Sequence, residues 1–222
     1  LIAGTVVKKS IGGMREALNK NFHAGFTVSA GSGLLKERDA QKILKTEGIK
    51  KANFQANELV ETGSLKLVEG GGGVTLDKTD ESKNLVASFV NDSAEIEEFL
   101  NGKYEMREGR GILNESDNKV LIHEEFAKLN QIKVGDEIEI GLLKKKMKLK
   151  VVGIFSGKDS KQTFASEMIE NRFFVSMKTL AKIKNKMEYT TAKYLVKDPK
   201  QVDAVMGAVK KLDIDFGKLN IE

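Results

Sequence analysis

The first third of the sequence changes its hydrophobic period three times, and this order of patterns limits the folds that the chain can adopt. Residues 5–24 place an apolar side chain at every third or fourth position, which predicts a helix with one buried stripe. Residues 26–30 then alternate between apolar and polar or small side chains, which predicts a strand. A second helix is predicted over 36–47, with Gly48 as its stop, and a second strand over 49–62. The region therefore consists of a helix and a βαβ unit.

The C-terminal end repeats the strand–helix–strand order. Residues 192–196 predict a short strand. Asp198 and Pro199 then predict a helix start, because Asp caps free backbone N–H groups and proline is tolerated in the first helical turn. Residues 202–212 carry the apolar stripe of this helix, and residues 214–221 predict a closing strand.

Two βαβ units at opposite ends of a chain can pair into a split, ferredoxin-like sandwich. We therefore predict an α+β fold with a base from residues 1–62 and 171–222, and an inserted, small, β-rich lobe from residues 63–170. The elements predicted between the two βαβ units are strands at 86–90, 120–122, 136–140, 147–155 and 173–175 and helices at 94–100, 124–130 and 178–186.

The composition is that of a globular domain with a mixed charged surface. Charged residues make up 31% of the chain, and 37 basic against 32 acidic side chains give a net charge of +5. The densest basic run, residues 144–150, fits a hairpin that leads into a strand with solvated lysines. Because it lacks interleaved aromatic residues, we predict no nucleic-acid partner. The chain contains no cysteine, which excludes disulfides and thiolate metal sites.

The two ends of the sequence suggest a longer protein. No run of about 18 apolar residues is present, so the sequence contains no predicted membrane helix. It starts at Leu1 without methionine and enters the first predicted helix at once. We therefore expect membrane segments outside residues 1–222.

Groups that carry catalysis are sparse. The histidines His23 and His123 lie far apart in the sequence, and neither has a metal-ligand companion three or four residues away. Hydrolase, zinc-protease and nucleotide-binding motifs are absent from the sequence. We predict no catalytic, cofactor-binding or metal-binding residue, and His123 is interpreted as the junction between a strand and a helix.

Three short segments suggest ligand loops but fit turns better. The sequence Gly31-Ser32-Gly33 lies between a strand and a helix, but it lacks the spacing and the lysine of a phosphate-binding loop. The run Gly70–Gly73 predicts a mobile loop. Asp77, Asp80 and Glu81 lack the spacing of a calcium-binding loop and are expected to be solvated.

One stretch of about fifty residues resembles a known family. Its marks are the pair Gly109-Arg110, the run from Asn118 to Asn130, the pair Gly135-Asp136, and Gly153 within Val151-Val152-Gly153-Ile154-Phe155. In this order they are similar to the extracytoplasmic region of MacB/FtsX-like ABC transporter permeases, and most similar to Gram-positive Vex-type and antimicrobial-peptide permeases. We interpret Gly109, Arg110, Gly135, Asp136 and Gly153 as structural motif residues, because glycine suits turns and Asp136 can accept a hydrogen bond from its own turn.

The resemblance implies a porter-like base that carries a small inserted lobe on the outer side of a cell membrane. It also implies a separate ATPase subunit, a second permease copy or homologue, and a peptide substrate or membrane-fusion-like accessory protein as partners. The implied function couples ATP hydrolysis to peptide export or antimicrobial resistance. Two alternatives stay open, a sensor of antimicrobial peptides that signals to a histidine kinase and a free-standing enzyme. We expect the lobe to move on hinges at Gly70–Gly73 and Ser156-Gly157.

Overall fold

The computed structural model of the chain describes residues 14, 23–69, 84–159 and 165–222. Its contacts divide the chain into two compact units, a terminal unit of residues 1–54 with 188–222 and an inserted unit of residues 55–187. Of the helix predicted over 5–24, Met14 is helical, and its other residues up to 22 lie outside the described ranges, as does Gly70–Gly73. The predicted division at residues 63 and 170 stays a prediction, since these two units have other limits.

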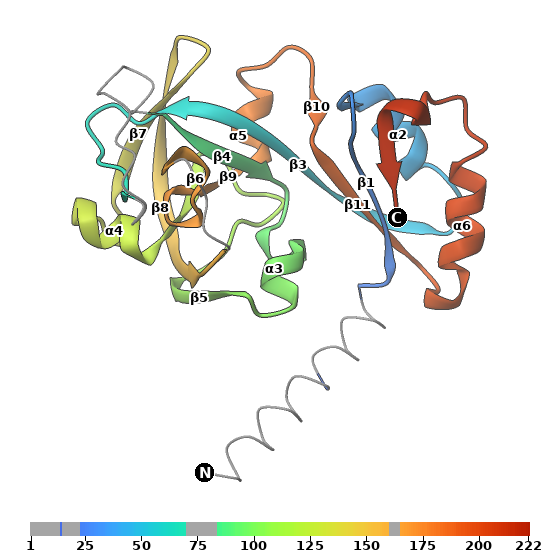
Figure 1. Cartoon of the computed structure of the whole chain (residues 1–222), viewed down its shortest axis with the longest axis horizontal. Helices are drawn as coiled ribbons and strands as arrows, with labels where there is room; N and C mark the ends of the chain where they lie inside the picture. The colour runs from blue at the N-terminus through green and yellow to red at the C-terminus, as the bar shows by residue number, and fades with distance from the viewer. Residues whose placement is uncertain (1–13, 15–22, 70–83, 160–164) are drawn as a thin grey trace. The chain divides into compact units, whose positions relative to one another are not determined.

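The terminal unit is a small sheet with two helices beside it (Figure 1). Its elements are β1 (Gly25–Ala30), β2 (Leu35–Lys36), α2 (Glu37–Leu44), the first part of β3 (Ile49–Glu61), β10 (Glu188–Tyr189), β11 (Thr191–Val196), η5 (Pro199–Gln201), α6 (Val202–Val209), η6 (Phe216–Lys218) and β12 (Leu219–Ile221). The strand order is β12-β1-β11-β3, and β2 pairs with β10. Because β1 is antiparallel to both β11 and β12, β11 and β12 run parallel with β1 between them. The ferredoxin-like fold predicted for the base stays a prediction.

Aromatic residues hold the core of the terminal unit. Phe26 stacks on Tyr194 with ring centroids 5.4 Å apart, and Phe54 meets the edge of Tyr194 at 6.1 Å. The Tyr194 hydroxyl donates a 3.0 Å hydrogen bond to the Ala40 carbonyl of α2, and burial raises the pKa of this phenol. This hydrogen bond links α2 to the sheet. It also satisfies a buried hydroxyl that would destabilise the fold if it had no partner.

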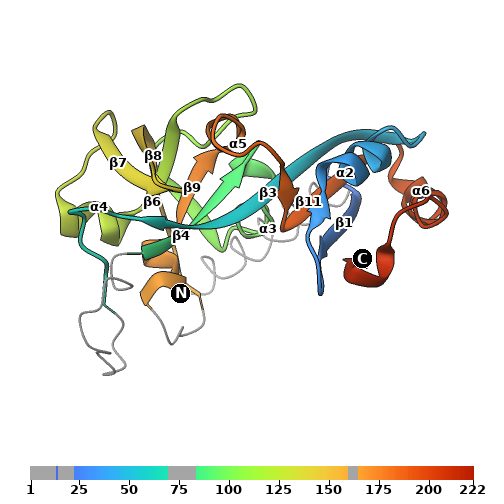
Figure 2. The same cartoon turned by 90° about the horizontal axis from the view of Figure 1, so that it is seen from above.

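The inserted unit is richer in strands. Its elements are the second part of β3, β4 (Asn84–Val90), η2 (Ser93–Glu95), α3 (Glu97–Leu100), β5 (Tyr104–Gly109), β6 (Lys119–His123), α4 (Glu124–Asn130), β7 (Glu137–Leu142), β8 (Lys145–Gly157), η3 (Ala165–Glu167), η4 (Ile169–Asn171), β9 (Phe173–Ser176) and α5 (Met177–Ala181). Its strand order is β3-β4-β9-β6-β8-β5, and β7 pairs with β8. A single bridge, Glu61 opposite Gly141, joins β7 to β3 and closes the circuit of strands. Figure 2 shows β7 and β8 side by side.

Strand β8 organises the inserted unit. From Met147 to Val151 buried apolar residues alternate with exposed lysines, and from Val151 to Ser156 every residue is buried. Along one edge the strand pairs first with β7 and then with β5, while β6 pairs with its other edge. The register with β6 skips Val152, which marks a bulge where the partner changes.

The structure confirms the predicted mixture of α and β and corrects several elements. The helix predicted over 178–186 ends at Ala181, and the predicted strand 214–221 is reduced to β12 because residues 216–218 form a 3₁₀ turn. The helix predicted over 94–100 is divided into η2 and α3 by the extended backbone of Ile96. Ser156 and Gly157, where the sequence predicts a hinge together with the polar residues that follow, are paired with β5 inside β8, and the hinge motion itself stays a prediction.

Candidate functional site

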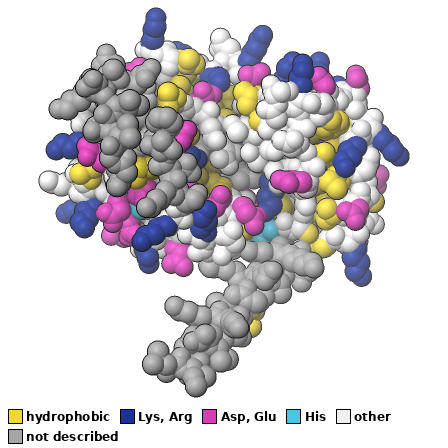
Figure 3. Space-filling model, viewed as in Figure 1, with side chains coloured by type: hydrophobic (Ala, Val, Ile, Leu, Met, Phe, Trp, Pro, Cys, Tyr) yellow, Lys and Arg dark blue, Asp and Glu magenta, His cyan; other side chains and the backbone are white. Residues whose placement is uncertain are grey.

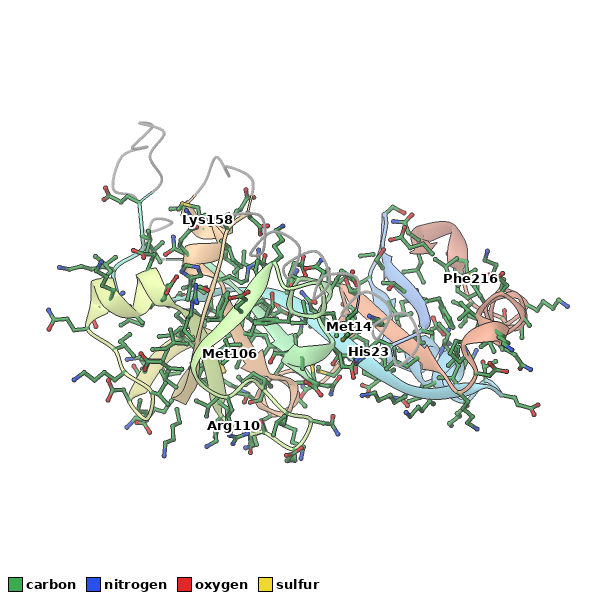
Figure 4. The ribbon with its side chains drawn as sticks, turned by 90° about the horizontal axis from the view of Figure 1, so that it is seen from below. Met14, His23, Met106, Arg110, Lys158 and Phe216 are labelled. Carbon is green, nitrogen blue, oxygen red and sulfur yellow. The ribbon has the colours of Figure 1, made fainter. Side chains whose placement is uncertain are left out.

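The motif glycines lie where β5 and β8 approach each other closely. Gly109 is the cross-strand partner of Gly153. A Cβ atom on either one would lie 2.2 Å from a carbonyl oxygen, that of Arg110 for Gly153 and that of Val152 for Gly109. Gly109 also has a φ of +68°, a conformation that favours glycine. The Arg110 N–H donates a 2.9 Å hydrogen bond to the Val152 carbonyl, and Figure 4 labels Met106 and Arg110 along this segment.

The second motif pair holds the neighbouring part of β8. The Gly135 N–H donates to the Val151 carbonyl at 2.8 Å, and the Val151 N–H donates to the Asp136 carbonyl at 2.8 Å. The Asp136 carboxylate accepts the Lys133 N–H at 2.8 Å and closes its own turn. The motif residues are thus brought together around residues 151–153 of β8, where they organise backbone pairing rather than a reactive group.

Polar side chains at the end of β8 form a second cluster. Tyr104 donates a 2.6 Å hydrogen bond to Asp159, and the Lys103 ammonium pairs with the other oxygen of the same carboxylate. Burial works to raise the pKa of Asp159, but hydrogen bonds from Lys103 and Tyr104 hold that pKa below its ordinary value. Burial and the bond to Asp159 raise the pKa of Tyr104, and burial lowers the pKa of Arg172, which donates to Ser88 Oγ at 3.3 Å. The cluster therefore contains a carboxylate–ammonium pair and a phenol that holds its proton.

His123 lies at the junction of β6 and α4, as the sequence indicates. Its Nδ1 accepts the Glu125 N–H at 3.2 Å and caps α4. Its Nε2 lies 3.0 Å from the Gly157 carbonyl, which makes Nε2 the donor because Nδ1 is the acceptor. Both ring nitrogens are used within the fold. Among the described residues no group of three His, Asp or Glu side chains could hold a metal ion.

A shallow cavity of about 460 Å³ opens on the inserted unit. It is lined by Gly63, Ser64, Leu65, Asn130, Gln131, Ile132, Asp136, Glu137, Ile138 and Glu139. The carboxylates of Glu137 and Glu139 are each within 4 Å of a lysine ammonium, Lys148 for Glu137 and Lys146 for Glu139. Since these carboxylates are paired with lysines on the hairpin, the cavity lacks the converging polar groups of a small-molecule site.

Two asparagines hold the segment that follows β3, a feature that the sequence analysis missed. The Asn130 amide exchanges two hydrogen bonds with the backbone of Lys66, at 2.8 and 2.9 Å. The fully buried Asn171 amide does the same with Val68, at 2.8 Å each. The two amides thus take the place of a neighbouring strand. Only the tertiary structure brings them to residues 66–68, so neither position carried a local signal.

The geometry describes a mixed α/β domain built around motif residues that order its backbone. The chain belongs to the MacB-like periplasmic core domain family, which matches residues 8–212. It is 26% identical to "Uncharacterized ABC transporter permease YclI" of Bacillus subtilis (strain 168), over 91% of this chain and 48% of that protein, so it spans about half of that relative's length.

Solved structures have a similar fold. The crystal structure of the periplasmic region of MacB from Actinobacillus actinomycetemcomitans matches with a TM-score of 0.54 and 14% identity, over 92% of this chain and 91% of that one. The extracellular domain of the noncanonic ABC-type transporter YknZ from Gram-positive bacteria matches with a TM-score of 0.48 and 10% identity, over 81% of this chain and 87% of that one. Within the described ranges, no helix is long and apolar enough to cross a membrane.

Proposed function

We propose that this domain is the extracytoplasmic part of an ABC transporter permease and that it transmits motion rather than performing chemistry. A separate ATPase subunit hydrolyses ATP on the cytoplasmic side, and membrane helices on either side of the domain carry the resulting movement outward. The output is export of peptides, or resistance to antimicrobial peptides, at the surface of a Gram-positive bacterium.

The observation that carries this proposal is the backbone pairing between the start of β1 and the end of β12. Thr27 and Glu222 exchange two backbone hydrogen bonds, of 2.7 and 3.1 Å. The start of β1 and the end of β12 therefore lie at the same end of the sheet. Two membrane helices that continue from this end would move the sheet as one body.

The polar groups support a mechanical role. Tyr104 and Asp159 are bound to each other, and His123 uses both ring nitrogens within the fold. A domain whose polar groups are occupied in this way acts through contacts with partners. The expected partners are the ATPase, a second permease copy or homologue, and a peptide or a membrane-fusion-like accessory protein.

The first test asks on which side of the membrane the domain lies. Because the chain contains no cysteine, a Lys146→Cys substitution in the full-length permease introduces one thiol into this domain, at a side chain that is 79% exposed. We expect a membrane-impermeant maleimide to label this cysteine in intact cells. Labelling that requires cell lysis would contradict the proposal.

The sensory alternative makes a different prediction. A sensor would bind an antimicrobial peptide through this chain alone, and its loss would abolish the transcriptional response while leaving transport by the permease intact. We expect the opposite result, loss of resistance with an intact response. The two readouts can be measured in one deletion strain that expresses the permease without residues 23–222.

A further inference from the structure

The turn between β7 and β8 has a backbone that its residues do not favour. Leu143 and Lys144 have φ values of +51° and +62°, so both central residues of this two-residue hairpin are left-handed. Turns of this kind favour Asn-Gly, because left-handed φ crowds the Cβ of other residues. A turn needed only to reverse the chain would be better served by those residues. The choice of leucine and lysine therefore calls for another reason.

The same turn exposes an apolar side chain next to a run of lysines. Leu143 is 61% exposed at the hairpin tip. The next three residues are lysines, of which Lys146 bonds to Glu139 at 2.9 Å. Lys144 and Lys145 form no ion pair with any of the described residues. We call residues 143–146 the hairpin tip.

A second exposed leucine lies on the neighbouring strand. A bridge between Glu61 and Gly141 pairs β3 with β7. Leu59, two residues before Glu61 on β3, is 56% exposed. Figure 1 shows the hairpin at the top left, and Figure 3 shows Lys and Arg side chains distributed over this face of the molecule. The hairpin tip thus presents an exposed leucine followed by three lysines.

We propose that the hairpin tip is a docking element for a partner protein that presents carboxylates around an apolar contact. Charge complementarity identifies this partner chemistry, because Lys144 and Lys145 form no ion pair within the described ranges, and Lys146 shows that a lysine of the tip can bind a carboxylate, that of Glu139. Leu143 supplies the apolar anchor. The lysines that alternate along β8 are explained by a strand face that is exposed to solvent. An exposed leucine at the turn, Leu143, is not explained in this way. The inference concerns a partner surface and does not depend on the proposed coupling role.

The test uses the 222-residue chain, labelled with ¹⁵N, and a designed twelve-residue peptide that alternates Glu and Leu. A Gln-Leu peptide of the same length is the control ligand. We expect the Glu peptide to shift the amide resonances of residues 141–146, and the Gln peptide to leave them unchanged. Raising the salt concentration should weaken this binding, since exposed charge pairs are screened.

Two variants separate the contributions of charge and apolar contact. Lys144→Glu with Lys145→Glu should weaken binding at least about tenfold, because attraction becomes repulsion. Leu143→Asn with Lys144→Gly keeps the hairpin in its favoured turn and should also weaken binding. The matched control, Lys210→Glu with Lys211→Glu, makes the same charge change at exposed lysines after α6 and should bind as the unmodified chain does.

Several results would overturn the proposal. These are shifts centred elsewhere, equal binding of the Gln peptide, or unchanged affinity in the Lys144→Glu, Lys145→Glu variant with its amide spectrum intact. Vesicles of phosphatidylglycerol that bind the hairpin tip while the Glu peptide does not would assign the tip to a lipid surface instead.

Discussion

Replacing Gly153 by alanine adds one methyl group at the closest approach of β5 and β8. The new Cβ would lie 2.2 Å from the Arg110 carbonyl oxygen and 2.7 Å from the Met106 methyl. The methionine can rotate away, but the carbonyl belongs to a backbone that is itself bonded to Val152 at 2.9 Å. A normal contact therefore requires the two strands to separate by roughly 1 Å, since a carbon and an oxygen meet at about 3.2 Å.

This separation sets the expected cost. It weakens about two backbone hydrogen bonds, each worth about 1 kcal/mol, and adds overpacking strain of about 1–3 kcal/mol. We expect Gly153→Ala to lower the free energy of unfolding of the inserted unit by about 3–5 kcal/mol, a large part of a typical domain's stability. The control is Gly207→Ala in α6, where no atom lies within 4 Å of the new Cβ. Helix propensity predicts a gain of about 0.5–1 kcal/mol for that change.

Urea unfolding followed by circular dichroism measures both variants, and hydrogen exchange of residues 104–110 assigns the effect to β5. A Gly153→Ala variant within about 0.5 kcal/mol of the unmodified chain would refute the close approach. So would a loss of equal size in Gly207→Ala, because it would show that the assay does not resolve position.

Three further predictions concern the stability of the inserted unit and the binding of magnesium-ATP. Tyr104→Phe should lower the free energy of unfolding by about 1–2 kcal/mol at pH 7, because it removes the hydrogen bond to Asp159. Since the pKa of Asp159 is depressed in the fold, this difference should shrink as the pH falls through the folded pKa. A difference that does not depend on pH would exclude the Asp159 carboxylate as its source. Leu143→Asn with Lys144→Gly should stabilise the chain by about 1 kcal/mol, since both residues then suit positive φ; destabilisation in thermal unfolding would show that the tip residues hold the hairpin together. Calorimetry of the chain with magnesium-ATP should detect no binding, and micromolar affinity would contradict the non-catalytic assignment.

Local patterns predicted those elements whose side chains alternate or recur regularly. The lysines that alternate with Met147 and Leu149 made β8 visible in the sequence, and the buried run after Val151 continued it. Strand β5 left no such signal, because four of its six residues are charged or glycine and its pairing with β8 makes it a strand. Ser156 and Gly157 have the composition of a linker, and tertiary pairing overrides that composition.

The candidate site, like the fold, could be predicted from the sequence only in part. The resemblance located Gly109, Gly135 and Gly153, while their assembly around one stretch of β8 required the tertiary structure. The positive φ values of Leu143 and Lys144 could not be predicted, since those residues rarely adopt them. The asparagine clamp on residues 66–68 likewise joins segments far apart in the sequence.

The central claim, that this domain moves in response to ATP hydrolysis on another subunit, is tested most directly by hydrogen–deuterium exchange on the intact transporter. The permease and the proposed ATPase subunit are reconstituted together, and exchange over residues 23–222 is compared between the nucleotide-free and the vanadate-trapped states. The account predicts a change in amide exchange within this domain, although the proposed nucleotide site lies on the other side of the membrane. Identical exchange in every peptide of the domain, in a preparation that hydrolyses ATP, would contradict it.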